Sequence, residues 1–176
     1  MKKTTAMILL MASALMFGGF MPPEGFSAAA ADDPYGPLRL YDGKWEIKTS
    51  DSEKNEMQVE NHCTKTGLFF VCEQVVNGKS EALVVFLPLA KTATGGEEYR
   101  TQALGADASA AGEWGKLTIE GDRWVYSWEN KDGNKKTYWR NVNTFTGTDK
   151  IHFEVQRSDD ESTWKTQKSG DEKRVK

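Results

Sequence analysis

From residue 40 onward, hydrophobic and polar residues alternate in short runs, and each run ends at a turn signal. In one run Met57, Val59, Asn61 and Cys63 alternate with polar neighbours. A period of two predicts a β-strand with one buried face, and helical periodicity is almost absent. Hairpin turn pairs such as Asn77-Gly78 separate the runs. The pattern predicts strands over 40–47, 55–64, 68–76, 81–87, 99–104, 114–120, 123–129, 136–145, 151–156 and 162–174.

These strands predict one all-β domain over 40–176, an antiparallel meander closed into a barrel of about eight to ten strands. Closure is favoured because it removes the exposed edges of a sheet. A sandwich of two sheets is the alternative architecture. The Ala/Ser/Gly-rich link over 105–112 could hold a helical turn, and the Pro/Gly-rich stretch 32–39 is expected to be a flexible leader.

The first 31 residues have the layout of a secretory signal peptide. A short basic start, Lys2-Lys3, precedes an apolar run over 6–17 and a small-residue stretch over 27–31. The apolar run is too short to cross a bilayer comfortably. We therefore expect cleavage near Ala30 or Ala31, no membrane span after the signal is removed, and export to the periplasm or the cell exterior.

Two cysteines, Cys63 and Cys72, flank a turn between two predicted strands. Opposed residues of an antiparallel pair have Cα atoms about 4.5 to 5.5 Å apart, which suits a disulfide. Disulfides persist outside the cytosol, so export and this pair support each other. The sequence predicts a Cys63–Cys72 staple, although a single bulge would move Cys72 to the other face.

The charge limits the classes of partner. The whole chain has a net charge of −3, and removal of Lys2, Lys3 and Glu24 with residues 1–31 leaves about −4. Nucleic acids and anionic membrane surfaces require clustered Lys and Arg. We expect neither as a partner, and the sequence does not determine the oligomeric state.

Several short motifs occur in an order that resembles a known family. They are Cys63 with Gly67 through Cys72, Gly121 through Trp124, Arg140, and Ser158-Asp159 through Trp164. Together they resemble the secreted bacterial family called domain of unknown function 1579, over roughly residues 40–173. The resemblance implies a calycin-like, lipocalin-like barrel and no established activity. One departure is Asp159-Asp160-Glu161-Ser162, where the family turn usually has Asp-Gly.

Gly43-Lys44-Trp45 also looks like the Gly-x-Trp at the start of the first strand in lipocalin-like barrels. There the Trp packs under a basic residue of the last strand, and Arg174 is the candidate in this chain. A guanidinium over an indole face is favourable by about 0.5 to 2 kcal/mol.

No residue pattern predicts catalysis, a metal site or a cofactor. His62 and Cys63 are strand neighbours that point to opposite faces, so they cannot form a nucleophile and base pair. The spacing of Cys63, Cys72, His62 and His152 does not suit zinc. His152 is expected on the surface, and the acidic turn at 159–161 lacks the spaced ligands of a calcium loop.

The remaining signal is the set of aromatic residues at alternate strand positions. They either fill the core or line a cavity for a small apolar or amphipathic ligand, since a barrel of eight strands is just wide enough for either. Glu60 and Arg140 would orient a polar head group if both point inward. The candidate ligand-binding residues are Tyr126, Trp128, Trp139, Phe153, Arg140 and Glu60.

Three functions stay open on this basis. The first is a binding module for a small molecule, and the second is an enzyme that acts on a small organic substrate in the barrel. The third is an envelope protein-interaction module with a filled core. Convergent ionisable groups in the cavity would favour the enzyme, and apolar walls with a few fixed donors would favour the carrier.

Overall fold

The computed structural model describes residues 33–50, 56–106 and 114–176. The expected signal peptide and most of the 105–112 link lie outside these residues. No helix in the described part of the chain is long and apolar enough to cross a membrane. The elements are η1 (Pro37–Tyr41), β1 (Gly43–Thr49), β2 (Glu56–Thr66), β3 (Phe69–Val76), β4 (Lys79–Lys91), β5 (Glu97–Gly105), β6 (Gly115–Glu120), β7 (Arg123–Asp132), β8 (Lys135–Thr146), β9 (Lys150–Ser158) and β10 (Lys165–Arg174).

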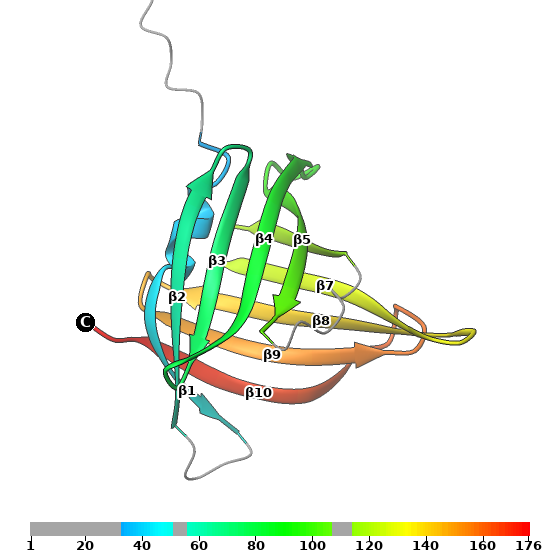
Figure 1. Ribbon diagram of the computed structural model, residues 1–176. Coiled ribbons are helices and arrows are strands. Elements are labelled where there is room, and N and C mark those ends of the chain that lie inside the picture. The colour runs from blue at the N-terminus through cyan, green and yellow to red at the C-terminus, as the bar shows by residue number, and fades with distance from the viewer. Residues whose placement is uncertain (1–32, 51–55, 107–113) are drawn as a thin grey trace, which may run out of the picture. The chain divides into compact units, whose positions relative to one another are not determined.

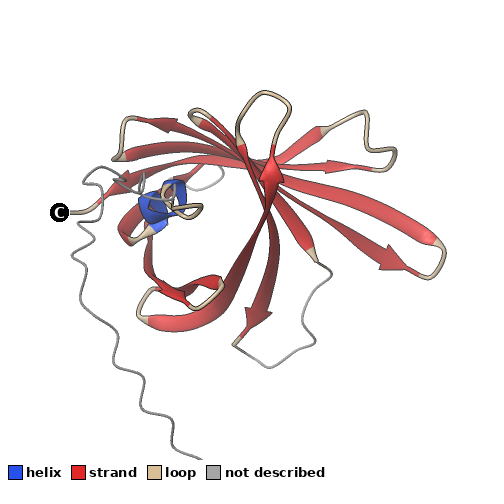
Figure 2. Cartoon of the chain, turned by 90° about the horizontal axis from the view of Figure 1, so that it is seen from above, coloured by secondary structure: helices blue, strands red, loops and turns tan. Residues whose placement is uncertain are grey.

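The ten strands form one closed antiparallel barrel, as the alternating pattern predicts. Each strand pairs with its neighbours in sequence, and β1 pairs with β10 to close the ring. Figures 1 and 2 show the resulting meander from the side and from above. At the closing seam Trp45 lies opposite Arg174 and Ile47 lies opposite Glu172. Closure satisfies both edges that an open sheet would leave unpaired.

The segment before β1 belongs to the packed structure. Tyr35 and Leu38 are almost fully buried, with 2% and 0% of their surface exposed. The Tyr35 hydroxyl donates to the carbonyl of Leu68, and the Tyr99 hydroxyl donates to the carbonyl of Pro34. This differs from a leader outside the domain, because turn-forming Pro and Gly residues here carry two apolar side chains into the core.

One part of the barrel, which we call the packed end, is filled by aromatic side chains around η1. Tyr35 stacks on Phe70 and on Tyr99, with ring centroids 5.5 and 6.2 Å apart. Tyr41 packs edge-on against Trp124 at 4.9 Å. Buried members of the same cluster are Tyr35, Leu38, Trp45, Phe70, Cys72, Phe86, Tyr99, Leu117, Ile119, Trp124, Phe145 and Ile151.

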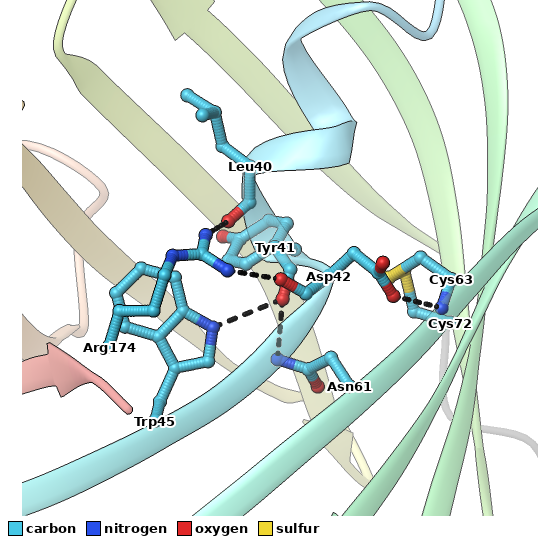
Figure 3. Close-up of a disulfide and its surroundings, with 8 residues drawn as sticks. All are labelled: Leu40, Tyr41, Asp42, Trp45, Asn61, Cys63, Cys72 and Arg174. Atoms are coloured by element: carbon cyan, nitrogen blue, oxygen red, sulfur yellow. Dashed lines mark hydrogen bonds between the residues drawn. A yellow bond between two sulfur atoms is a disulfide. The ribbon is translucent and has the colours of Figure 1, made fainter. Parts of the chain in front are cut away.

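Arg174 closes the barrel beside Trp45 (Figure 3). Its guanidinium carbon lies 4.2 Å from the indole centroid, where the sequence analysis expects a basic residue of the last strand. The guanidinium also donates to the carbonyls of Leu40, Asp42 and Thr148. Gly43 has a φ of 108°, and a Cβ there would come within 2.8 Å of Arg174 Nη1. The positive φ therefore favours glycine, and a Cβ would also displace the Arg174 guanidinium from its hydrogen bonds.

The disulfide predicted between Cys63 and Cys72 is present. The two residues are paired directly across β2 and β3, and their Cα atoms are 4.1 Å apart. Asp42 Oδ1 accepts a hydrogen bond of 2.9 Å from the Cys63 backbone N–H, which ties this pair to the start of β1 (Figure 3).

Candidate functional site

The barrel contains a partly open cavity of about 290 Å³, which we call the central cavity. Its lining comes from β1 to β8 and β10, together with Tyr41 of η1. The position follows from strand alternation, since the lining residues are successive inward positions along each strand. Its apolar walls are Ile47, Val59, Cys72, Ala82, Val84, Phe86, Ala103 and Leu117, and its polar or amphipathic residues are Tyr41, Asn61, Gln74, Tyr126, Asn141, Asn143 and Glu172.

Tyr41 connects the cavity to the packed end. Its ring packs on Trp124, and its hydroxyl accepts a hydrogen bond of 2.9 Å from Asn143 Nδ2. Its backbone carbonyl accepts from Trp45 Nε1 at 3.1 Å and from Asn61 Nδ2 at 3.2 Å (Figure 3). Burial raises the pKa of the Tyr41 phenol well above its usual value. The hydroxyl therefore stays protonated and can donate a hydrogen bond.

Two amide oxygens at the cavity have no partner in the described part of the chain. They are Oδ1 of Asn141 and Oδ1 of Asn143, on adjacent inward positions of β8. A buried acceptor without a hydrogen bond costs about 1 to 3 kcal/mol. Both residues line the cavity, so a small rotation of either side chain would bring its oxygen to a donor on a bound molecule.

Glu172 is the acidic residue of the cavity lining. It lies on β10, with Ile47 and Ile151 opposite it on the neighbouring strands. Burial raises the pKa of its carboxyl to about 7, because an apolar environment disfavours the charged form. Near neutral pH this group can therefore either donate a proton or accept a hydrogen bond.

The aromatic candidates from the sequence divide between separate places. Tyr126 lines the central cavity, and its ring lies 5.4 Å from that of Trp128. Trp128 in turn stacks on Trp139 at 6.3 Å with an angle of 11°. These two tryptophans border a groove apart from the central cavity. Phe153 is buried in a separate cluster with Ile47 and Val59.

Glu60 and Arg140 both point away from the barrel interior. Glu60 forms an ion pair of 3.2 Å with Lys44 on the neighbouring strand. Arg140 stacks over the Trp164 ring at 4.1 Å and donates to Gln156 Oε1 at 2.6 Å. Their predicted role, to orient a polar head group, requires that both point inward. That condition is therefore not met.

Sequence reasoning missed Glu172, Asn141 and Asn143. The alternation of strand faces could have indicated each of them, because each lies on the same face as a residue that the sequence does single out. Glu172 is two positions before Arg174, whose expected contact with Trp45 places both on the inner face. Asn141 and Asn143 likewise share the face of Trp139 on β8.

Among the described residues, no group of three His, Cys, Asp or Glu side chains is arranged to hold a metal ion. His152 is exposed on the surface, and its Nδ1 lies 2.8 Å from Asp171 Oδ1. In the acidic turn, Asp160 Oδ1 accepts from the backbone N–H groups of Ser162 and Thr163. These bonds lower the pKa of the Asp160 carboxyl. They order a turn in which Glu161 has a φ of 63°, a conformation usually taken by glycine.

Comparison of the sequence with models of known protein families and with curated proteins found no match in either. The resemblance to domain of unknown function 1579 stays a prediction, and the central cavity is the feature on which a function can be argued.

Proposed function

We propose that the barrel binds one small amphipathic molecule in the central cavity. The observation that carries the proposal is the pair of cavity-lining residues Asn141 and Asn143, whose buried amide oxygens have no hydrogen-bond partner among the described residues. Small-molecule sites are typically concave and mostly apolar, with a few fixed polar groups that orient the ligand. The apolar walls of the cavity and the two asparagines both support binding here.

The chemistry of the walls narrows the class of ligand. Val84, Phe86 and Leu117 offer an apolar surface for its body. On the polar side, two amide oxygens and the Glu172 carboxyl favour a donor, so we infer a head group with an amine or hydroxyl. A volume of about 290 Å³ lies at the small end of known ligand sites, which indicates a single compact molecule.

A fluorescent aromatic amine, N-phenylnaphthylamine, tests the proposal because it combines apolar rings with one N–H donor. The wild-type protein should enhance its emission in a saturable way. Ala103→Leu adds three carbons at a cavity-lining position and should abolish that enhancement. Ala90→Leu makes the same change at an exposed position of β4 and should leave it intact. Equal enhancement by both variants would rule out binding in the cavity.

Catalysis in the same cavity is the second candidate, favoured by Glu172. A carboxyl with a pKa of about 7 is suited to general acid and base work near neutral pH. Native mass spectrometry of protein purified from its own cells would recover the bound molecule. Incubation of that molecule with the wild-type protein distinguishes the two functions, since a carrier returns it unchanged. An enzyme would convert it, and Glu172→Gln would stop the conversion.

We also propose that the chain is exported and that its barrel is related to domain of unknown function 1579. Support for export comes from the basic, apolar and small-residue order of residues 1–31 and from the Cys63–Cys72 disulfide, which suits an oxidising compartment. Intact-mass measurement of the protein recovered outside the cytoplasm should give a chain that begins near Asp32. A mass that still includes residues 1–20 would contradict export with cleavage.

A further inference from the structure

A second hollow lies on the outer surface of the barrel, with a volume of about 750 Å³. Residues of β4 to β8, Trp114 just before β6 and the turn between β9 and β10 line it, and we call it the outer groove. Its charged and tryptophan side chains are Arg100, Trp114, Lys116, Arg123, Trp128, Glu129, Lys136, Trp139, Arg140, Glu161 and Trp164. It is distinct from the central cavity, with which it shares none of these residues.

Strand register places basic residues of the groove in one row across the sheet. Arg100 on β5 is opposite Lys116 on β6, Lys116 is opposite Ser127 on β7, and Ser127 is opposite Arg140 on β8. Like charges directly opposite on neighbouring strands are destabilising. Arg123 adds to this crowding, since burial and the charge of Arg123 together lower the pKa of Arg140. This row of positive charge occurs in a chain whose overall net charge is −3.

Three of these cations have no carboxylate partner in the described part of the chain. Lys116 pairs with Glu98 and Lys136 pairs with Glu129, both at 3.2 Å, whereas the groove's three arginines form no ion pair there. Arg140 instead bonds to the neutral amide of Gln156. Guanidinium groups bind carboxylates through two parallel hydrogen bonds, and all three arginines retain donors for such a contact.

Flat aromatic surfaces lie beside the arginines. The Arg100 guanidinium lies over Trp114 at 5.8 Å, and that of Arg140 lies over Trp164 at 4.1 Å. Trp114 keeps 49% of its surface exposed. Such indole faces pack well against the C–H groups of a sugar ring. Each of these two guanidinium groups therefore lies next to an aromatic ring that a sugar could contact.

We propose that the outer groove binds an acidic oligosaccharide, with carboxylates on Arg100, Arg123 and Arg140 and sugar rings on Trp114 and Trp164. The charges favour this class over a nucleic acid, because nucleic-acid binding requires many phosphate contacts. Among its described residues the groove offers three cations without an ion pair, and the carboxylates of Glu129 and Glu161 also line it. This proposal is independent of ligand binding in the central cavity.

Isothermal titration with oligogalacturonate, a linear carboxylated sugar chain, tests the proposal. The fully methyl-esterified form keeps the rings and loses the charges, so it should bind at least about tenfold more weakly. A single-stranded oligothymidylate of equal length tests the competing class. Weaker binding of the acidic sugar than of the ester or the oligonucleotide, or no binding of it, would overturn the proposal.

Variants locate the site. Arg123→Gln and Trp164→Leu should each weaken oligogalacturonate binding by about tenfold, a loss that one charge-assisted contact or one stacked ring can supply. Arg39→Gln removes the same charge at an exposed residue outside the groove and should leave the affinity unchanged. Melting temperatures should be measured alongside, and Ala103→Leu provides a folded control with a blocked cavity. Unchanged affinity in both groove variants would place any binding elsewhere.

Discussion

The packed end and the central cavity lie in the same barrel, and their inward residues differ in kind. Around η1 the inward positions hold interlocking aromatic rings such as Trp124 and Phe145, whose centroids are 4.5 Å apart. In the cavity they hold smaller or polar residues such as Ala103, Asn141 and Glu172. From the sequence alone, a filled core and a ligand cavity are alternatives. The barrel contains both, because the size and polarity of inward residues change along its axis.

The largest expected contrast between the two regions is in the cost of removing an aromatic side chain. Trp124 is 1% exposed and contacts both Tyr41 and Phe145, so Trp124→Ala should lower the free energy of unfolding by about 3 to 5 kcal/mol. Tyr126, two residues on, borders empty space, and Tyr126→Ala should cost much less. Urea unfolding of both variants measures the difference. Equal losses would mean that the cavity wall is packed as tightly as the end.

Glu172 distinguishes the regions by pH. Its folded pKa of about 7 exceeds the ordinary value of 4.5, so the folded state binds the proton more tightly than the unfolded state. Stability from this group is fully present below pH 4.5 and is lost as the pH rises to about 7. The loss is up to about 3 kcal/mol at pH 8.

Glu172→Gln removes this dependence, because the amide carries no charge to bury. The variant should gain stability relative to the wild type as the pH rises from 4 to 8, as measured by unfolding at each pH. Glu46→Gln, at an exposed position of β1, serves as the matched control and should follow the wild type. If Glu172→Gln and the wild type have the same dependence of stability on pH, Glu172 is hydrated and lies outside the cavity.

The disulfide links the two regions, since Cys72 belongs to the core cluster and also lines the cavity. Replacement of Cys63 and Cys72 by Ser should lower stability by roughly 2 to 3 kcal/mol without loss of the barrel, because the bond closes a short loop within an existing hairpin. Thermal unfolding with and without a reductant measures this. A loss of β-sheet circular dichroism in the double variant would mean that the barrel depends on the bond.

Local patterns were enough to predict the fold, because alternation and turn residues act between sequence neighbours. The paired cysteines and the contact between Trp45 and Arg174 follow from the same patterns together with ring closure. Local patterns do not predict how deep along the barrel axis a residue lies, because that depth depends on how the strands are staggered around the whole ring. Trp128 and Trp139 have the parity of inward residues, yet they border the outer groove. Glu172 has the same parity and lines the cavity.

Composition also concealed the packing of the segment before β1. Pro34, Gly36 and Pro37 are typical of a turn or a leader, and on that basis 32–39 is predicted to be a flexible leader. The contacts of Tyr35 with Phe70 and Tyr99 are tertiary, so nothing near it in the sequence indicates them.

The smallest expected effect comes from Tyr41, which lies between the two regions. Tyr41→Phe keeps the ring against Trp124 and removes only the hydroxyl that accepts from Asn143 Nδ2. We expect a loss of about 1 kcal/mol, since one neutral hydrogen bond is removed and water in the cavity can partly replace it. Tyr138→Phe, at a residue that lines the outer groove, should change stability by less, and urea unfolding compares the two. The same Tyr41 variant should weaken N-phenylnaphthylamine binding, because Asn143 is then free to rotate away from the ligand. If stability falls by several kcal/mol instead, the hydroxyl supports the packed end more than the cavity, and the boundary between the two regions would have to be placed deeper in the barrel.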